Sequence, residues 1–385
     1  MVQERVSRAP LRFDRRELAG AFGDLGTDFP LLAGLTLACG LDGGSVLACA
    51  GALQIAAGVF YRMPMPVEPL KALAAIAIAE RLPPSVIAGA GLALGVIMLL
   101  MTATGLLDAF ARAVPKTVVR GIQCGLGLQL ASLAARQFLP AGGAAGWALA
   151  AVCALIVVAL SGNERVPSAL IVIGLGLAYA LATTLSPRAL AAGFGLHLPV
   201  FAAPDARDVA RGFWLLALPQ LPLSLANSVL ATRRTALDLF PDRAPAVRTI
   251  GFTYAAMNLV APLFGGAPSC HGSGGIAGHY AFGARTGGSV VIYGSLFLAL
   301  GLFFGGAFAQ ILQAFPKPVL GVLLGFEGLA MLGLIRDEAH DTNSFALVLL
   351  LGMIAAFTPY GYLTALGLGV ALYRVRDRLA FKTLR

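Results

Sequence analysis

The most constraining feature of this 385-residue sequence is a succession of long apolar stretches that runs almost from end to end. A helix that crosses a bilayer needs about 20 mostly apolar residues. Windows of this kind recur at 18–38, 44–61, 66–80, 84–104, 115–136, 145–161, 166–186, 213–232, 245–263, 271–283, 287–306, 316–335, 343–357 and 359–374. Charged residues make up only 12% of the chain, too few to cover a water-soluble surface. The sequence predicts an all-α polytopic membrane protein of about 14 spans, and it excludes a soluble or a disordered chain.

Two windows, 66–80 and 271–283, are too short to cross a membrane as full helices. Each adjoins a stretch rich in glycine and proline, YRMPMPVEP at 61–69 and GGAPSCHGSGG at 265–275. Irregular backbone at membrane depth survives only where protein or a cavity surrounds it, because lipid cannot pair its N–H and C=O groups. We therefore expect discontinuous third and tenth spans.

Basic residues predict the orientation of the chain. They gather before the first window, in the loop after the eighth and after the last: Arg5, Arg8, Arg12, Arg15, Arg16, Arg233, Arg234, Arg243, Arg248, Arg374, Arg376, Arg378, Lys382 and Arg385. Such clusters mark cytoplasmic segments. We expect a multi-pass protein of the inner (plasma) membrane with both termini cytoplasmic. The net charge of +9 is then a topology signal, and its scattered residues argue against nucleic-acid binding.

The windows divide the chain into five segments. We expect a cytoplasmic N-terminal segment at 1–17, a first repeat at 18–186, a linker or interfacial segment at 187–212, a second repeat at 213–374 and a short cytoplasmic tail at 375–385. The charged N-terminal segment lacks the apolar core of a signal peptide. No regulatory domain is expected after the last window.

The two halves echo each other in sequence. Ala113-Val114-Pro115-Lys116 opens the fifth window, and Ala314-Phe315-Pro316-Lys317 opens the twelfth, 201 residues later. Val59-Phe60 and Leu263-Phe264 each lead into a Gly/Pro-rich stretch, and they are 204 residues apart. With seven spans each, the halves would enter the membrane from opposite sides. This 7+7 inverted repeat is typical of secondary transporters.

A helix that begins inside the membrane exposes unpaired N–H groups and about half a positive charge at its N-terminus. We expect the third span to start near Pro66-Val67-Glu68-Pro69, because proline suits the first turn. The tenth span should start near Ser269-Cys270-His271-Gly272-Ser273, where glycine lets the backbone approach a ligand. Two such ends facing each other near the bilayer midplane would form an anion site.

Polar side chains in neighbouring windows fit such a site. Gln220 and Asn227 share one helical face in the eighth window, and Thr27 lies three residues after Asp24 in the first. Lys71, placed one turn into the third window, would help to neutralise a dianion. Such residues also have plainer roles, since amides join helices in membranes.

Glu327 lies deep inside the twelfth window, and ionisable residues at such depth usually mark a pathway or a coupling site. Plainer readings stay open at this stage. Lys71 could pair with Glu68. Glu327 could make a hydrogen bond between helices, and Asp24 could cap a helix.

Four segments carry a resemblance to a known family: FGDLGTDFPLLAGL at 22–35, MPMPVEPLKALAAIAIAE at 63–80, LPQLPLSLANSVLAT at 218–232 with LDLFP at 237–241, and GGAPSCHGSGGIAGHYAFGARTGG at 265–288. They resemble the molybdate transporter family, a relative of the sulfate permeases, and the resemblance covers most of the chain. It implies high-affinity uptake of molybdate, with tungstate or sulfate as related anions. It also implies the inverted fold of uracil and sulfate permeases, in which a core and a gate domain hold the substrate at the third and tenth spans.

The resemblance and the polar positions together define the candidate substrate-binding residues. They are Thr27, Pro66, Val67, Glu68, Lys71, Gln220, Asn227, Ser269, Cys270, His271 and Gly272. Plant-like members tend to carry Gln at the position of Glu68. Because a carboxylate repels a dianion, Glu68 is either protonated when the anion binds or points away. Glu68, Glu327 and Asp24 are the candidates for proton coupling.

The expected function is secondary active import of molybdate, coupled to protons, by alternating access. A sulfate or nucleobase transporter of the same fold and an anion channel remain alternatives. The expected partners are the anion, protons and the lipid bilayer, and a homodimer stays open. We expect no cofactor, metal site, nucleic-acid partner or enzymatic activity, because no metal-ligand spacing, P-loop or Gly-x-Ser-x-Gly motif is present.

Overall fold

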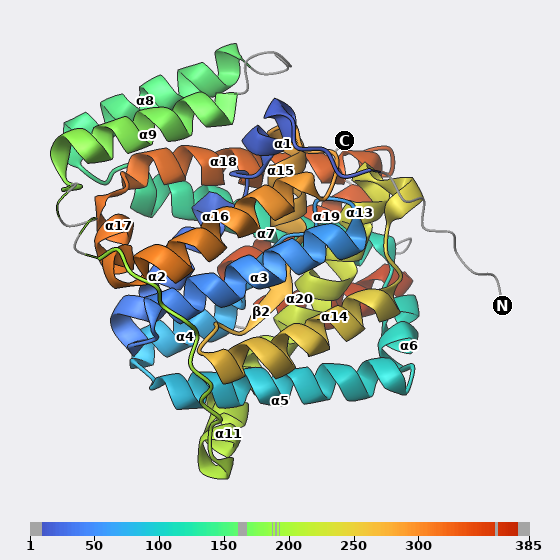
Figure 1. Cartoon of the computed structure of the whole chain (residues 1–385). Helices are drawn as coiled ribbons and strands as arrows, with labels where there is room; N and C mark the ends of the chain where they lie inside the picture. The colour runs from blue at the N-terminus through green and yellow to red at the C-terminus, as the bar shows by residue number, and fades with distance from the viewer. Residues whose placement is uncertain are drawn as a thin grey trace.

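The computed structural model describes residues 10–160, 168–186, 188, 191, 193–358 and 361–375. The predicted tail from residue 376 onward lies outside the described residues, as do Pro187 and the basic residues Arg5 and Arg8. The described part is almost entirely helical, and its long helices lie roughly side by side (Figure 1).

The helices follow the order of the predicted windows, and two short strands lie where the third and tenth spans were expected to be broken. The first half contains α1 (Arg15–Gly20), α2 (Leu25–Cys39), α3 (Gly43–Tyr61), β1 (Val67–Pro69), α4 (Lys71–Glu80), α5 (Pro84–Ala103), α6 (Leu106–Ala113), α7 (Lys116–Leu133) with a π-helical end at Ala134–Phe138, α8 (Gly143–Ala159) and α9 (Ser168–Thr183). The second half contains α11 (Ala206–Gly212), α12 (Leu218–Leu223), α13 (Thr232–Leu239), α14 (Val247–Val260), β2 (Ser269–His271), α15 (Ser273–Ala281), α16 (Gly288–Phe304), α17 (Phe308–Ala314), α18 (Lys317–Gly333), a 3₁₀ turn at Leu334–Glu338, α19 (Thr342–Phe357) and α20 (Gly361–Val375).

Every predicted window contains a helix, yet many of these helices are short. Among the described residues, six helices are long and apolar enough to cross a membrane: Gly43–Tyr61, Pro84–Ala103, Lys116–Phe138, Ala206–Leu239, Gly288–Ala307 and Lys317–Glu338. The count of 14 spans and the inverted repeat therefore stay predictions. Helices α7 and α18 both begin at the lysine after a proline, Pro115 and Pro316, as the repeated motif suggested.

Two predicted boundaries differ from the structure. The window at 18–38 is interrupted, because the chain turns between α1 and α2 and Asp24 precedes α2 without capping it through its side chain. The predicted linker at 187–212 already contains the start of a helix at Ala206. There the Asp205 side chain accepts a hydrogen bond from the Asp208 N–H at 2.7 Å. That helix runs on through α11, α12 and α13 to Leu239.

Prolines shape this long helix. Pro219 and Pro222 cannot donate a backbone hydrogen bond, so the regular ladder is lost around α12. The chain adopts π-helical turns on either side, at Phe213–Ala217 and Ser224–Ala231. These wider turns place Gln220, Ser224 and Asn227 at the centre of the protein, where all three are buried.

Glycines bring α3 and α16 into direct backbone contact. A Cβ atom added at Gly51 would lie 2.4 Å from the Leu298 nitrogen, and one at Gly301 would lie 2.5 Å from the Ala48 nitrogen. A side chain at either position would push the helices apart. Small residues at helix interfaces are typical of membrane proteins, in which packing rather than water exclusion holds helices together.

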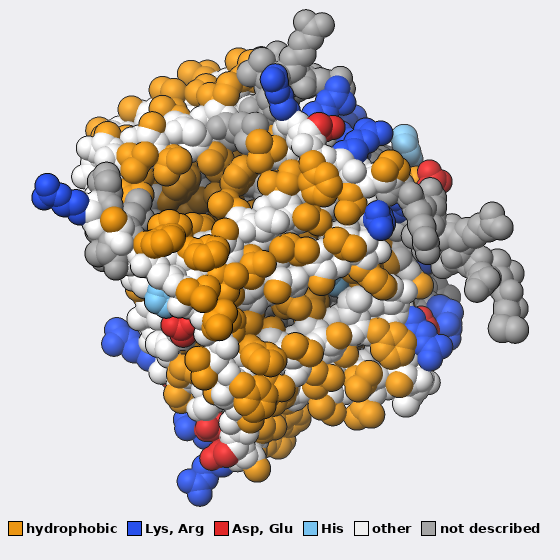
Figure 2. Space-filling model, viewed as in Figure 1, with side chains coloured by type: hydrophobic (Ala, Val, Ile, Leu, Met, Phe, Trp, Pro, Cys, Tyr) orange, Lys and Arg blue, Asp and Glu red, His pale blue; other side chains and the backbone are white. Residues whose placement is uncertain are grey.

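The packing separates the helices into two groups. The strand bundle contains α2–α5 and α11–α16 around β1 and β2, and the flanking bundle contains α7–α9 and α18–α20. They meet where α15 and α2 pack on α18, and where the middle of the 206–239 helix packs on α7 and α20. Figure 2 shows hydrophobic side chains over most of one face, with Lys and Arg gathered toward its margins. This distribution suits a protein surrounded by lipid.

Candidate anion-binding site

The two predicted helix breaks meet at the centre of the protein as a pair of short strands. β1 and β2 are antiparallel, with Val67 opposite His271, Glu68 opposite Cys270 and Pro69 opposite Ser269. Helices α4 and α15 begin just after the strands, and because the strands are antiparallel the two helix starts lie at opposite ends of the strand pair. The unpaired N–H groups of both first turns therefore flank the strand pair.

The third span was predicted to start near Pro66–Pro69 and the tenth near Ser269–Ser273, but Val67–Pro69 and Ser269–His271 are strands, and the helices start at Lys71 and Ser273. Proline favours extended backbone at the preceding residue, and it removes N–H groups that a helix would need. Helix α4 begins only at Lys71, so this residue lies at the helix start rather than one turn in. The positive end of the α4 dipole and the Lys71 ammonium group therefore lie at the same place.

Two amide side chains satisfy the outer edges of the strand pair. Gln54 on α3 donates to the Val67 carbonyl at 2.9 Å and accepts from the Val67 N–H at 3.0 Å. Asn258 on α14 does the same for Ser269, at 2.6 and 3.0 Å. Neither residue was predicted for the site. Each is the sole Asn or Gln of its apolar window. The two are 204 residues apart in sequence, as are Val59-Phe60 and Leu263-Phe264.

Glu68 points into the site. Its side chain is fully buried, forms an ion pair with Lys71, and accepts a hydrogen bond from the Gly275 N–H at 3.0 Å. The structure therefore does not show Glu68 pointing away from the site, which was one of the two predicted alternatives. The carboxylate already occupies the N-terminus of α15, as a bound anion would.

Further carboxylates converge on the first turn of α15. A Cβ atom added at Gly275 would lie 2.5 Å from Asp24 Oδ2, and one at Gly274 would lie 2.5 Å from Glu327 Oε1. Glu327 Oε2 accepts a hydrogen bond from the Thr27 hydroxyl at 2.9 Å. Within the described part of the chain, both Asp24 oxygens and Glu327 Oε1 are buried without a hydrogen-bond partner.

Gln220 and Asn227 each hold one of the two helix starts. Gln220 Oε1 accepts the Leu73 N–H of α4 at 2.9 Å, and its amide donates to the Ser224 hydroxyl at 3.1 Å. Asn227 Oδ1 accepts from the Ser273 hydroxyl at the start of α15, at 2.7 Å. Both side chains are engaged in holding the helix starts. The backbone N–H groups and Lys71 are therefore the groups best placed to contact an anion.

Cys270 and His271 are neighbours in β2, and their side chains make different contacts. His271 uses both ring nitrogens, Nδ1 with the Pro66 carbonyl at 3.1 Å and Nε2 with the Thr253 hydroxyl at 3.0 Å. Its ring is thus held between Pro66 of the first half and Thr253 of the second. Cys270 is buried opposite Glu68. Gly272 leaves room for Glu68, because an added Cβ atom would lie 1.7 Å from Glu68 Oε1.

A cavity of about 380 Å³ reaches Lys71 from the interface between the bundles. Its walls come from α4 and α12 on one side and from α7, α19 and α20 on the other. Polar lining residues include Gln129, Thr358 and Tyr362, and the Tyr362 hydroxyl donates to Gln129 Oε1 at 2.6 Å. The cavity therefore places an open space beside the buried ion pair of Lys71 and Glu68.

Comparison with solved structures identifies the fold. The chain is similar to the transmembrane domain of a cyanobacterium bicarbonate transporter, BicA, with 17% identity, 91% of this chain and 99% of that chain covered, and a TM-score of 0.55. It is also similar to the murine Solute Carrier 26 family member A9 (Slc26a9) anion transporter in the inward-facing state, with 14% identity, 97% and 70% coverage, and a TM-score of 0.61. The chain is a multi-pass membrane protein with the fold of these proteins.

Sequence comparison identifies the family. Residues 16–130 and 212–331 match the family described as "Molybdate transporter of MFS superfamily". Molybdate transporter 2 of Arabidopsis thaliana is 36% identical, over 93% of this chain and 86% of that protein. Molybdate transporter 1 of Chlamydomonas reinhardtii is 29% identical, over 96% and 93%. The chain belongs to the molybdate transporter family, whose matched members are named as transporters and not as enzymes.

Proposed function

We propose that this protein imports molybdate as a secondary active transporter, in the plasma membrane with both termini cytoplasmic. The observation that carries the proposal is that the starts of α4 and α15 both contact Glu68, through Lys71 and the Gly275 N–H, beside a cavity of about 380 Å³. The names of the relatives support molybdate as the substrate. Tungstate and sulfate share its tetrahedral, doubly charged form, so they are the natural competitors.

The anion would bind between the first turns of α4 and α15, with its charge opposed by Lys71 and by the two helix dipoles. Glu68 holds part of that place in the described conformation. Molybdate must therefore displace the Glu68 carboxylate from the Gly275 N–H. In this scheme the ion pair with Lys71 is exchanged for an ion pair between Lys71 and the substrate.

Proton coupling follows from a count of buried charges. Asp24, Asp28, Glu68 and Glu327 are buried carboxylates of the same region, and among the described residues Lys71 forms an ion pair with one of them, Glu68. Adding a dianion to several ionised carboxylates in a low-dielectric interior would be very unfavourable. We propose that protons taken up by Glu68, Glu327 or Asp24 accompany the anion.

The direct test is uptake of radiolabelled molybdate by proteoliposomes that contain the purified protein. We expect saturable accumulation under an inward proton gradient, competition by excess tungstate, weaker competition by sulfate and none by uracil. Accumulation no greater than in empty vesicles would contradict the proposal. Flux that does not saturate and never exceeds equilibrium would favour a channel, and preference for sulfate would favour a sulfate transporter.

Replacing Glu327 by glutamine should uncouple uptake from protons and preserve anion binding. Glutamine can still accept the Thr27 hydrogen bond, but it cannot bind a proton at physiological pH. Each coupled proton contributes about tenfold to accumulation for a gradient of about one pH unit, since one pH unit corresponds to about 1.4 kcal/mol. We expect this stimulation to fall by that factor, as measured by uptake with and without the gradient.

The matched control is Asp108→Asn on α6, a carboxylate outside this cluster, which should keep the response of uptake to the proton gradient. Unaltered stimulation in Glu327→Gln would remove Glu327 from the coupling scheme, and Asp24→Asn would then be tested in the same way.

A further inference from the structure

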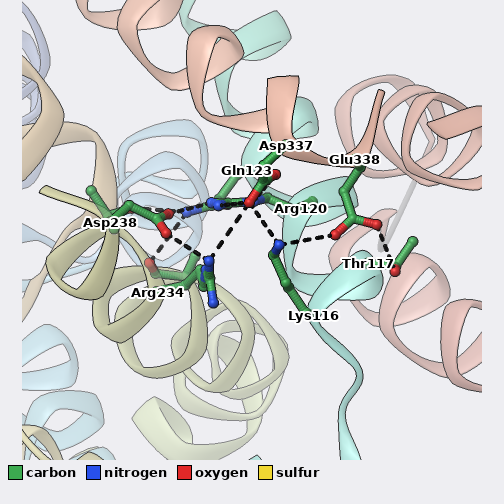
Figure 3. A network of polar contacts seen from close by, with 10 residues as sticks. Lys116, Thr117, Arg120, Gln123, Arg234, Asp238, Asp337 and Glu338 are labelled. Carbon is green, nitrogen blue, oxygen red and sulfur yellow. Dashed lines mark hydrogen bonds and ion pairs between the residues drawn. The ribbon is translucent and has the colours of Figure 1, made fainter. Parts of the chain in front are cut away.

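A network of ion pairs joins α7, α13 and the segment that follows α18 (Figure 3). Arg120 on α7 is at its centre, with only 2% of its side chain exposed. Its Nε and Nη2 atoms donate to the two oxygens of Asp337, at 3.0 and 2.6 Å, and its Nη1 atom contacts Asp238. A guanidinium group that holds two carboxylates in this way is strongly positioned, because each bond is charge-assisted.

The partners of Arg120 belong to different bundles. Asp337 follows α18, in the flanking bundle with Arg120 itself, whereas Asp238 lies on α13 in the strand bundle. A second connection runs from Gln123 to the Thr235 hydroxyl, at 2.9 Å. Arg234 on α13 completes the crossing, at 2.7 Å from Asp238 and 3.6 Å from Asp337.

This network and the cavity lie at different levels of the same helices. Along α7, Arg120 precedes the cavity residue Gln129 by about 14 Å at 1.5 Å per residue. Along the long second-half helix, Arg234 follows the cavity residue Leu223 by about 16 Å. The crevice between the bundles is thus open beside Lys71 and bound together by charges at the end that holds α13. The basic segment that follows α13, with Arg243 and Arg248, predicts that this end is cytoplasmic.

We propose that the Arg120–Asp337–Asp238 network is a latch that closes the cytoplasmic end of this crevice, and that it must open for an anion to leave on that side. The inference rests on the proposed transport function. It assigns the described conformation as open toward the side opposite the termini. Arg120 acts through the position of the two bundles and does not touch the anion.

The test uses Cys270 as a reporter, because this thiol lies at the anion site opposite Glu68. Right-side-out and inside-out vesicles that contain the full chain are treated with a membrane-impermeant maleimide. Mass spectrometry then measures labelling at each cysteine, with buried Cys39, Cys49, Cys124 and Cys153 as internal standards. Arg120→Gln and Asp238→Asn should each raise labelling of Cys270 from the terminus-bearing side by at least about tenfold, and lower it from the other side.

The control is Arg248→Ala, since Arg248 is at the same end but outside the network, and it should label as the unaltered protein does. If Arg120→Gln exposes all five cysteines, the chain has lost its fold and Asp238→Asn decides the matter, because it leaves the bonds between Arg120 and Asp337. Wild-type labelling of Cys270 in Asp238→Asn would overturn the latch. Labelling needs no transport, so a shift in labelling without molybdate uptake would contradict the proposed function and leave the latch standing.

Discussion

Replacing Lys71 by methionine is expected to reduce molybdate uptake by about 30-fold or more, since truncating one partner of a buried charge pair costs about 2–5 kcal/mol. Lys71 is the first residue of α4, and its ammonium group forms the ion pair with Glu68. Methionine keeps the length of the side chain and removes that charge. Uptake at saturating and at low molybdate separates lost binding from lost turnover, and we expect the larger effect at low concentration.

The control for Lys71→Met addresses folding. The single variant leaves the Glu68 charge buried and unpaired, which destabilises the protein. The double variant Glu68→Gln/Lys71→Met removes both charges, so its thermal stability should return toward that of the unaltered protein while uptake stays absent. Uptake within about threefold of the unaltered rate in either variant would show that Lys71 does not hold the anion.

Replacing Gly272 by alanine should weaken molybdate binding by roughly 10- to 100-fold, the effect of about 1–3 kcal/mol from overpacking. The added methyl group would fall 1.7 Å from Glu68 Oε1, in the place where we expect the anion. The backbone of Gly272 has φ −114°, so alanine fits its conformation and the effect is steric. Equilibrium binding of labelled molybdate to purified protein measures it.

The matched control for Gly272→Ala is Gly174→Ala on α9, where an added Cβ atom meets nothing within 4 Å. Binding there should be unaltered, because alanine favours a helix. Normal affinity in Gly272→Ala would mean that the anion binds elsewhere than at the start of α15.

The sequence predicts the helices and their interruptions well, because hydrophobic length and Gly/Pro content are local properties. The windows at 66–80 and 271–283 were expected to be broken, and α4 and α15 are indeed short and preceded by non-helical backbone. The pairing of Val67–Pro69 with Ser269–His271 was not predicted. It joins segments about 200 residues apart, which no local pattern encodes.

Side-chain partners over long distances were equally hard to predict. Arg120 was not singled out, because its partners Asp238 and Asp337 are 118 and 217 residues away in sequence. Glu68 was recognised as a problem for an anion site, yet only the structure shows that it faces the Gly275 N–H. Charge and burial could be inferred from composition, whereas the direction of a side chain depends on the assembled fold.

The amide clamps of Gln54 and Asn258 have a consequence for the central ribbon. In a strand, successive side chains point to opposite faces, so a slip by one residue would turn Glu68 away from α15 and bring a neighbour in its place. With both outer edges already bonded, such a slip would break four hydrogen bonds at once. Two uncharged residues, Gln54 and Asn258, therefore keep the Glu68 carboxylate pointed at the start of α15.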